Sequence, residues 1–183
     1  MEKITNQNFQ EIIKNKDIFN MHFIWIDFSG ENFSLKNFSD CKIEKCNLSN
    51  ISIKNTTFNN VYFIKSKIMW LDFTLINTIL SNFNFLNCNI DLCSFNQMIL
   101  KNINFEDSFI KECNFSKTNL ENSNFSYCNL EKTIFNQTNL KNANLIGSSN
   151  FYIDPNLNNL EKTKFSRENA ILLLSSLNII IEW

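Results

Sequence analysis

The chain has six cysteines, and their spacing shows whether they could bind a metal ion. Structural zinc sites use cysteines two to four residues apart, together with further cysteine or histidine ligands. Each cysteine here instead lies two residues before a Phe, Leu or Ile, at a position that holds Thr118, Ser123, Thr133, Thr138 and Ala143 in neighbouring repeats. The two Cys-x₄-Cys pairs, Cys41 with Cys46 and Cys88 with Cys93, fit the five-residue period of the chain. We therefore expect reduced, buried core residues and no metal site. The six are Cys41, Cys46, Cys88, Cys93, Cys113 and Cys128.

The single histidine, His22, limits the catalytic schemes that the chain could support. Nucleophilic mechanisms of the Ser-His-Asp or Cys-His type need a histidine placed next to a nucleophile and an acid. His22 stands beside Ile24 and Trp25, and the sequence identifies no acid or nucleophile partner for it. Adjacent carboxylates such as Glu106 and Asp107 would need a cleft to act as general acid and base. We therefore expect no enzyme, no cofactor and no small-molecule substrate.

The structural element that carries these residues is indicated by an apolar residue at every fifth position. A period of five fits neither the 3.6-residue repeat of an amphipathic helix nor the heptad of a coiled coil. A short strict period predicts a solenoid, in which each unit buries its apolar residue by stacking on its neighbours. One slip of seven residues separates two runs. The first is Ile13, Ile18, Phe23, Phe28, Phe33, Phe38, Ile43, Leu48, Ile53, Phe58, Phe63, Ile68 and Phe73, and the second is Leu80, Phe85, Ile90, Phe95, Leu100, Phe105, Ile110, Phe115, Leu120, Phe125, Leu130, Phe135, Leu140 and Leu145.

Composition narrows the function classes further. The chain has 183 residues, 2 Gly, 1 Pro and a net charge of −1 from 17 basic and 18 acidic residues. Glycine-rich phosphate loops are therefore excluded, and abundant Asn is expected to supply the turns. The N-terminus lacks the apolar core of a signal peptide, and no apolar run approaches the ~20 residues that cross a bilayer. We expect a single cytoplasmic domain over residues 1–183, with no membrane partner and no direct nucleic-acid partner.

The repeat is clearest over residues 113–132, which read CNFSK, TNLEN, SNFSY and CNLEK. This pattern resembles the pentapeptide-repeat family, whose consensus is small, Asp or Asn, Leu or Phe, polar, variable. The resemblance implies an all-β fold, a right-handed quadrilateral β-helix of about seven coils with four five-residue faces each. The central apolar residue, here termed i, and residue i−2 would point inward.

A coil of twenty residues predicts columns of like residues along the rod. Phe columns are expected on two opposite faces of the second half, with Leu or Ile on the other two. Asn at i−1 is expected to form ladders between coils. The Phe columns are Phe85, Phe105 and Phe125 on one face and Phe95, Phe115 and Phe135 on the opposite face; the example ladder is Asn84, Asn104, Asn124 and Asn144.

The period is interrupted in two places. Two extra residues fall within 74–79, either as a tolerated bulge or as a partner-binding protrusion. After Leu145 a turn signal at 147–155 precedes a short return of the period to Phe165, so we assign the β-helix to 13–165 and an N-terminal cap to 1–12. Ser166 is expected to N-cap an α-helix over about 167–177, followed by a short strand over 178–183. This 166–183 tail would close the open end of the solenoid by forming a dimer.

The tail resembles the C-terminus of the Qnr-type and mycobacterial quinolone-resistance pentapeptide proteins. The resemblance implies a homodimer built by the helix and the strand. It also implies binding to DNA gyrase and topoisomerase IV, with protection from fluoroquinolones by a rod that imitates a DNA segment. The expected dimer residues are Ala170, Leu173, Leu174, Leu177, Ile179 and Ile181.

Charge argues against imitation of DNA by the whole surface. A dimer of ~66 Å would replace a DNA segment carrying about 39 negative charges, whereas two chains of −1 carry −2. Only a local acidic patch could serve, and Lys111 and Lys132 interleave with its acids. Before the slip lysines outnumber nearby acids, but the sequence indicates no aromatic and basic groove. The candidate partner-binding residues are Met69, Trp70, Asn77, Asp91, Glu106, Asp107, Glu112 and Glu131.

Two functions follow from these observations. The first is a dimeric topoisomerase-binding protein, indicated by the tail and by the continuity of the repeat. The second is a rigid scaffold or protein-interaction module with another partner. The weak acidity and the outward apolar residues favour this second function; they include Ile24, Trp25, Tyr62, Ile64, Met69 and Trp70.

Overall fold

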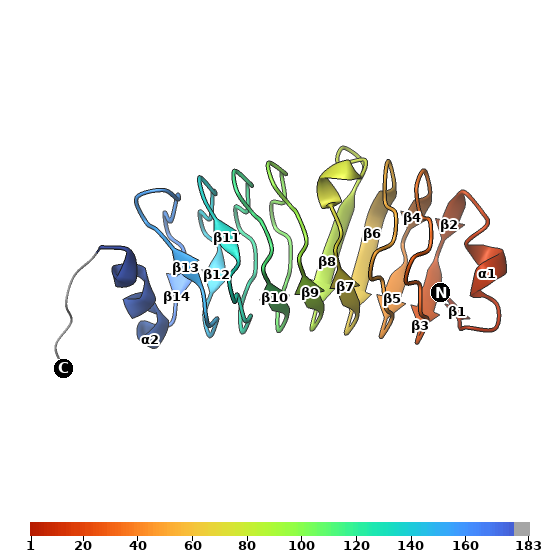
Figure 1. Ribbon diagram of the computed structural model, residues 1–183, viewed down its shortest axis with the longest axis horizontal. Helices are drawn as coiled ribbons and strands as arrows, with labels where there is room; N and C mark the ends of the chain where they lie inside the picture. The colour runs from red at the N-terminus through yellow and green to blue at the C-terminus, as the bar shows by residue number, and fades with distance from the viewer. Residues whose placement is uncertain (178–183) are drawn as a thin grey trace.

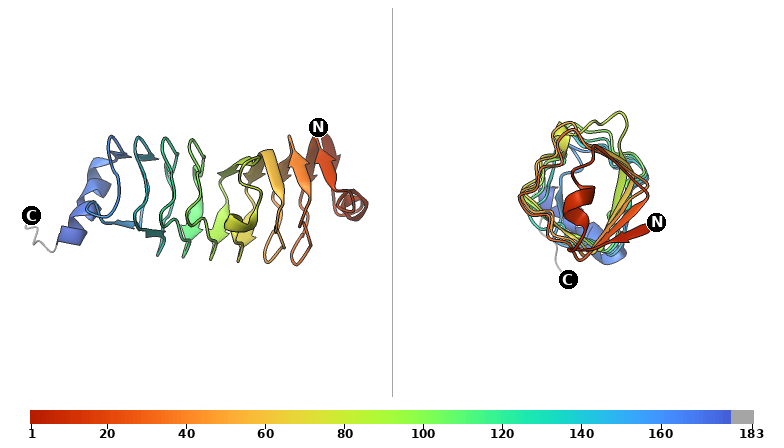
Figure 2. Two further views of the ribbon diagram at one scale, coloured as in Figure 1. Left: turned by 90° about the horizontal axis from the view of Figure 1, so that it is seen from above. Right: turned by 90° about the vertical axis from the view of Figure 1, so that its right-hand side faces the viewer.

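In the computed structural model the chain winds into a rod of about eight turns, with α1 at one end and α2 at the other (Figure 1). The structure describes the main chain of residues 1–177 and the side chains of residues 1–174. Seen along its axis, the rod has four sides (Figure 2), and the buried side chains fill its centre. The predicted right-handed quadrilateral β-helix is confirmed.

Most strands are short, because each side of the coil holds only five residues. The elements are β1 (Glu2–Ile4), α1 (Phe9–Ile12), β2 (Asp17–Phe19), β3 (Met21–Ile24), β4 (Asn37–Ser39), β5 (Lys42–Glu44), β6 (Thr57–Ile64), β7 (Lys67–Met69), the 3₁₀ helix η1 (Phe73–Leu75), β8 (Asn82–Leu86), β9 (Asn89–Asp91), β10 (Phe109–Lys111), β11 (Ile134–Phe135), β12 (Asn144–Leu145), β13 (Tyr152–Ile153), β14 (Lys164–Phe165), α2 (Arg167–Ala170) and the 3₁₀ helix η2 (Ile171–Leu177).

All strand pairings are parallel and join neighbouring coils. One face carries β1, β3, β5, part of β6 and β8, and another carries β7, β9 and β10. His22 pairs with Lys42, and Lys42 pairs with Tyr62. Each residue is therefore in register with the residue twenty positions later in the chain. This register places identical positions of the repeat directly above one another.

The Phe columns predicted from the period are present in the core. Phe95 stacks on Phe115 with ring centroids 4.8 Å apart and planes 3° from parallel. Phe105 lies between Phe85 and Phe125 in the same way, at 5.1 and 4.8 Å. Across the coil the contacts are edge-to-face, as for Phe95 and Phe105 at 85°. Both arrangements suit the quadrupole of an aromatic ring, and they leave the rod centre filled.

The corners of the coil explain why the repeat is polar at residue i+2. Residue i+2 occupies the left-handed region at nearly every corner, with φ between 50° and 64° in the non-glycine residues. Asn and Gly adopt this conformation at low cost, whereas other side chains pay a steric penalty. The chain nevertheless places large apolar residues at some corners, among them Trp25, Leu35, Trp70 and Leu92.

Asparagine at i−1 serves both the turn and the stacking of coils. Oδ1 of Asn124 accepts a hydrogen bond from the Ser126 main-chain N–H at 3.1 Å, and its Nδ2 donates to Asn104 Oδ1 at 3.0 Å. Nδ2 of Asn144 donates in turn to Asn124 Oδ1 at 3.2 Å. The predicted ladder is therefore confirmed over these three residues. At Asn84 the pattern changes, because its Oδ1 accepts from the main-chain N–H of Asn104.

The interruption after Phe73 changes the register by two residues, since Phe63 pairs with Ile43 behind it and with Phe85 ahead of it. Leu80, predicted to begin the second buried run, is 61% exposed, so that prediction is wrong. Phe83 is buried instead, with its ring 5.6 Å from Phe73. The small residue usually found at i−2 is here a phenylalanine, which buries more apolar area than Leu80 could.

Both ends of the rod are covered by short elements. At the N-terminal end β1 pairs with β3, and α1 lies across the opening with the Phe9 ring 5.3 Å from that of Phe28 (Figure 2). At the C-terminal end η2 lies beside β13. Leu172 and Leu173 are half-buried there against the core.

The tail differs from the predicted α-helix over 167–177. It is α-helical only from Arg167 to Ala170 and continues as a 3₁₀ helix to Leu177. Ser166 has the extended conformation of an N-cap, but its side chain makes no capping hydrogen bond. A short, weakly capped helix ends readily in 3₁₀ winding. The predicted strand over 178–183, with Ile179 and Ile181, lies outside the described residues, as does the Leu177 side chain.

Candidate partner-binding site

The cysteines have the structural surroundings of core residues. All six are free and buried. Burial raises the pKa of the Cys128 thiol to about 12, and its Sγ lies 3.0 Å from the Phe105 carbonyl oxygen that accepts its hydrogen bond. Thr118 and Ser148 occupy the same repeat position and donate to main-chain carbonyls in the same way. Within residues 1–174 no group of three or more metal-ligating side chains forms.

His22 has a carboxylate partner that sequence reasoning missed. Its Nε2 lies 2.9 Å from Oε2 of Glu44, a residue of the neighbouring strand β5. The partner is twenty-two residues ahead, because it is the diagonal neighbour in a coil of twenty. This offset could have identified Glu44 once the coil length was known. The contact joins strands β3 and β5 of neighbouring coils, so the pair links one coil to the next.

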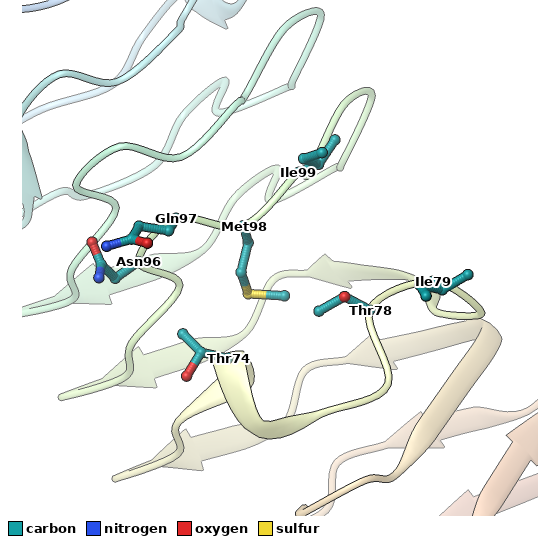
Figure 3. Close-up of a pocket in the computed structure, with 7 residues that line it drawn as sticks. All are labelled: Thr74, Thr78, Ile79, Asn96, Gln97, Met98 and Ile99. Atoms are coloured by element: carbon teal, nitrogen blue, oxygen red, sulfur yellow. The ribbon is translucent and has the colours of Figure 1, made fainter.

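The insertion forms a ridge with a groove on each side. One groove, about 640 Å³ in volume, is lined by Thr74, Thr78, Ile79 and residues 96–99 (Figure 3). The other, about 580 Å³, lies between residues 79–82 and the N-terminal coils at Asp17, Asn37, Ser39, Thr57 and Asn59. Ile79 lines both grooves, which makes it the crest of the ridge.

The first groove is uncharged. Met98 is buried at its base and extends toward Thr74 and Thr78, while Ile79 and Ile99 lie at its outer rim (Figure 3). Ile79 is 91% exposed and Ile99 is 77% exposed. None of the lining side chains titrates, so this surface can bind through apolar contact and through hydrogen bonds to amides and hydroxyls.

Asn77 supports the ridge from within. Its main-chain N–H donates to the Thr56 carbonyl oxygen at 2.9 Å, and its own carbonyl accepts from Ser81 Oγ at 2.7 Å. Ser81 Oγ in turn accepts from the main-chain N–H of Phe58. The main chain of Asn77 therefore has a structural role, which fixes the ridge on the coil before it.

Trp70 lies at a corner and contributes to a third hollow, of about 400 Å³. Its indole is 57% exposed, and Leu92 and Glu112 follow it along the same corner, lining the same hollow. Met69, the preceding residue, is half-buried in β7. Trp70 and Leu92 thus present a small apolar surface next to two carboxylates, because Asp72 also lines the hollow.

The acidic candidates do not form a continuous stripe. Lys111 is in register with Asp91, and its Nζ lies 3.6 Å from Glu131 on the other side. Glu112 belongs to the adjacent corner, where it lies 3.3 Å from Lys132 Nζ. These exposed pairs contribute little stability, but each lysine cancels the field of a carboxylate.

The same alternation continues on a third column of the second half. Lys101 lies 2.7 Å from Glu121, and Lys141 lies 2.7 Å from Glu161. The Glu121 carboxylate accepts a hydrogen bond from Lys101, which lowers its pKa. The surface after the slip is therefore a set of alternating charges that stack with a period of one coil.

Glu106 and Asp107 differ from the other candidate acids. Neither forms an ion pair within the part of the chain that the structure describes. They lie on the face of the Phe85 and Phe105 column, away from the Glu112 corner. The structure therefore brings Trp70 and Glu112 together and places Asp91 and Glu131 beside them. Two further surfaces stay separate from this one: the pair Glu106 and Asp107, and the ridge.

The expected dimer residues differ in exposure. Ala170 is exposed, whereas Leu173 and Leu174 are half-buried. Because Leu173 packs against the core of its own chain, part of the apolar surface of the tail already covers the last coil. Among the described helices, none is long and apolar enough to cross a bilayer.

Comparison with known proteins agrees with this architecture. A family model described as pentapeptide repeats, in 8 copies, matches residues 113–149. Among solved structures, a trypsin-treated variant of QnrB1, a plasmid-mediated fluoroquinolone resistance protein, has a TM-score of 0.67 and 17% identity, covering 99% of this chain and 95% of its own. A second trypsin-treated QnrB1 variant has a TM-score of 0.54 and 16% identity, covering 100% and 97%. No curated protein sequence matches the chain. The predicted resemblance to pentapeptide-repeat proteins is thereby confirmed, and at these identities the structural likeness concerns the fold.

Proposed function

We propose that this pentapeptide-repeat protein is a non-enzymatic binding protein whose partner is a type II topoisomerase, DNA gyrase or topoisomerase IV. Its binding would protect the enzyme from fluoroquinolones. The observation that carries the proposal is that the chain shares its fold, from the N-terminal cap to the tail, with a fluoroquinolone resistance protein. A rod filled with stacked Phe rings also leaves its outer surface as the place for function.

The contact that we propose uses shape and uncharged surface in preference to imitation of DNA charge. Lysines lie beside Glu112, Glu121 and Glu131 and neutralise them. The ridge at Ile79 and the corner at Trp70 instead expose apolar side chains within one coil of each other. Apolar side chains rimmed by polar groups are typical of protein–protein contact surfaces.

We further propose that the tail forms a homodimer. Ala170 is exposed on α2, and the half-buried Leu174 follows it one turn later. An apolar surface at the end of a solenoid needs a cover, because open strand edges otherwise pair with other chains. A twofold pairing of the tails would supply that cover and double the length of the rod.

A gyrase supercoiling assay with ciprofloxacin tests the function directly. Purified protein should restore supercoiling in the presence of the drug at concentrations where it does not itself inhibit the enzyme. A Trp70→Asn and Ile79→Ser double variant should lose this effect while keeping the thermal unfolding of the parent. Absence of both rescue and binding over a wide concentration range would contradict the proposal.

A rigid scaffold with another protein partner is the second candidate function. The exposed apolar side chains favour it, because they lie on several faces and at both ends, including Phe19, Phe109 and Tyr152. A pull-down from host lysate separates the two functions. Recovery of a partner other than topoisomerase subunits, lost in the matched surface variants, would support the scaffold.

A further inference from the structure

Within the described residues, the lysines before the slip form no ion pair with a carboxylate, whereas four of those after it do. Within residues 1–73 the structure contains no lysine–carboxylate pair, and the ion pair there is between His22 and Glu44. Residues 1–73 hold nine lysines and eight carboxylates, a net charge of +1, so any strongly positive surface there must come from local clustering of the lysines.

Several of these cations gather on the face formed by β1, β3, β5 and β6. Lys3 is in register with His22, His22 with Lys42, and Lys42 with Tyr62. The column crosses four neighbouring strands of one parallel sheet, so its side chains project from the same flat surface. Lys3 and Lys42 are exposed, and Tyr62 is half-buried between coils.

The corner beside this sheet adds an aromatic ring and two more lysines. Trp25 is 66% exposed, and Lys45 Nζ lies 4.6 Å from the centre of its ring. Lys65 occupies the same corner one coil further on and is exposed. The sequence indicated no aromatic and basic groove, and the structure instead gathers these residues on an exposed corner, because stacking of coils places residues twenty apart next to each other.

The carboxylates around this surface contact side chains other than its lysines, and they keep their negative charge. Glu44 is held by His22 at 2.9 Å, and Asp40 accepts a hydrogen bond from Asn60 Nδ2 at 2.6 Å. Asp27, on the adjacent face, accepts hydrogen bonds from Ser29 and Asn47, and Lys67 lies close enough to help lower its pKa. Glu2 is exposed at the edge of the sheet.

We propose that this surface, formed by Trp25, Lys42, Lys45, Tyr62 and Lys65, binds the phosphate backbone of nucleic acid. Lysines neutralise phosphates and release their counterions, while an exposed indole provides a face on which a base can stack. An acidic polypeptide would use the lysines but would leave the exposed indole without a matching group. The inference departs from the expectation of no direct nucleic-acid contact and does not depend on a topoisomerase partner.

Fluorescence anisotropy with the full-length protein alone tests the proposal. The probes are a fluorescein-labelled 20-nucleotide single strand and the blunt duplex of the same sequence, each titrated at several salt concentrations from 50 to 200 mM. We expect binding that weakens with salt at a logarithmic slope of about 2 to 3, as about three phosphate contacts would give. Trp25→Leu should weaken binding of the single strand more than that of the duplex, because bases in a duplex are already stacked.

Two lysines in the same corner conformation provide a matched pair of variants. Lys65 has φ 50° and Lys117 has φ 57°; both are exposed, and neither has an ion pair within the described residues. Lys65→Glu should weaken binding at least fivefold and lower the salt slope by about one, whereas Lys117→Glu should stay within twofold of the parent. Thermal unfolding of both variants checks the fold.

Three outcomes would overturn the proposal. The first is no binding of either probe at 50 mM salt, and the second is equal loss in Lys65→Glu and Lys117→Glu. The third is displacement of the probe by polyglutamate of equal charge as effectively as by unlabelled DNA, which would assign the surface to an acidic polypeptide. Failure of gyrase protection has no bearing on this measurement, because it contains no gyrase.

Discussion

At the scale of single residues, each position of the repeat has one physical task. Residue i fills the centre. A Cys, Ser or Thr at i−2 can donate a hydrogen bond to a carbonyl of the neighbouring coil, whereas an aliphatic residue there adds to the core. Asn at i−1 closes the turn and bonds to the next Asn. Residue i+2 forms the corner and adopts the left-handed backbone conformation, which Asn tolerates better than most other residues. Substitutions can therefore be judged by whether the new side chain can perform the task of its position.

Leu35→Asn should stabilise the protein by about 0.5–1 kcal/mol, because Asn adopts the left-handed conformation of this position with less backbone strain than Leu. Leu35 has φ 64° and is 62% exposed, so little apolar burial is lost. Chemical denaturation measures the change. Leu80→Asn is the control, because Leu80 is equally exposed but does not have a positive φ. An equal gain in both variants would refute corner strain as the cause.

Cys128→Ser should be nearly neutral at pH 7 and stabilising at pH 10. Burial raises the pKa of the Cys128 thiol from 9.0 to about 12, so the folded state keeps its proton while the unfolded state loses it above pH 9. The parent therefore loses stability between pH 9 and about 12, by about 1.4 kcal/mol at pH 10 from this group.

Serine is compatible with this site, because Ser108 and Ser148 hold the same position in the coils before and after. Denaturation at pH 7, 9 and 10 checks the prediction. Parallel loss of stability in parent and variant above pH 9 would show that the Cys128 thiol does not set the alkaline limit.

At the scale of elements, the insertion after η1 is where the chain departs most from its period. The ridge is supported by hydrogen bonds through Asn77 and Ser81 and by Phe83 beneath it. Its two most exposed residues, Ile79 and Leu80, lie outside this support. The insertion therefore divides into a structural base and an exposed crest.

Deletion of Ile79 and Leu80 should keep the fold and abolish protection of gyrase. It removes the two residues by which the register is shifted, while the Ser81 and Phe83 contacts can re-form. We expect the thermal unfolding midpoint to change by a few degrees at most. The supercoiling assay then reports function separately, and protection at the parental level would show that the ridge is not the contact.

At the scale of the whole molecule, the rod has two unlike halves. Unpaired lysines and an exposed Trp25 lie before the slip, whereas alternating Lys and Glu columns lie after it. The net charge of the chain does not reveal this difference in charge arrangement, because it is a sum over the two halves. A dimer joined at the C-terminal tails would carry the lysine-rich surfaces at its two distal ends.

Ala170→Arg should convert the dimer to a monomer without altering the fold. Ala170 is exposed in the single chain, so the change places a charge in the proposed interface and leaves the chain's own packing intact. Leu173→Asp is a poorer test, because Leu173 also packs against the core. Light scattering gives the mass, and a dimer mass retained by Ala170→Arg would contradict the proposed interface.

The five-residue period was enough to predict the β-helix, its filled core, the buried cysteines and the Asn ladder, because these features depend on a spacing that repeats along the chain. It could not decide where the register shifts, since Leu80 and Phe83 compete for one space and only packing chooses between them. It also missed His22 with Glu44 and Trp25 with Lys45, which are far apart in sequence and meet only when coils stack. The helical character of the tail was predicted, but its change to 3₁₀ winding after Ala170 was not, because the sequence did not show that Ser166 would make no capping hydrogen bond.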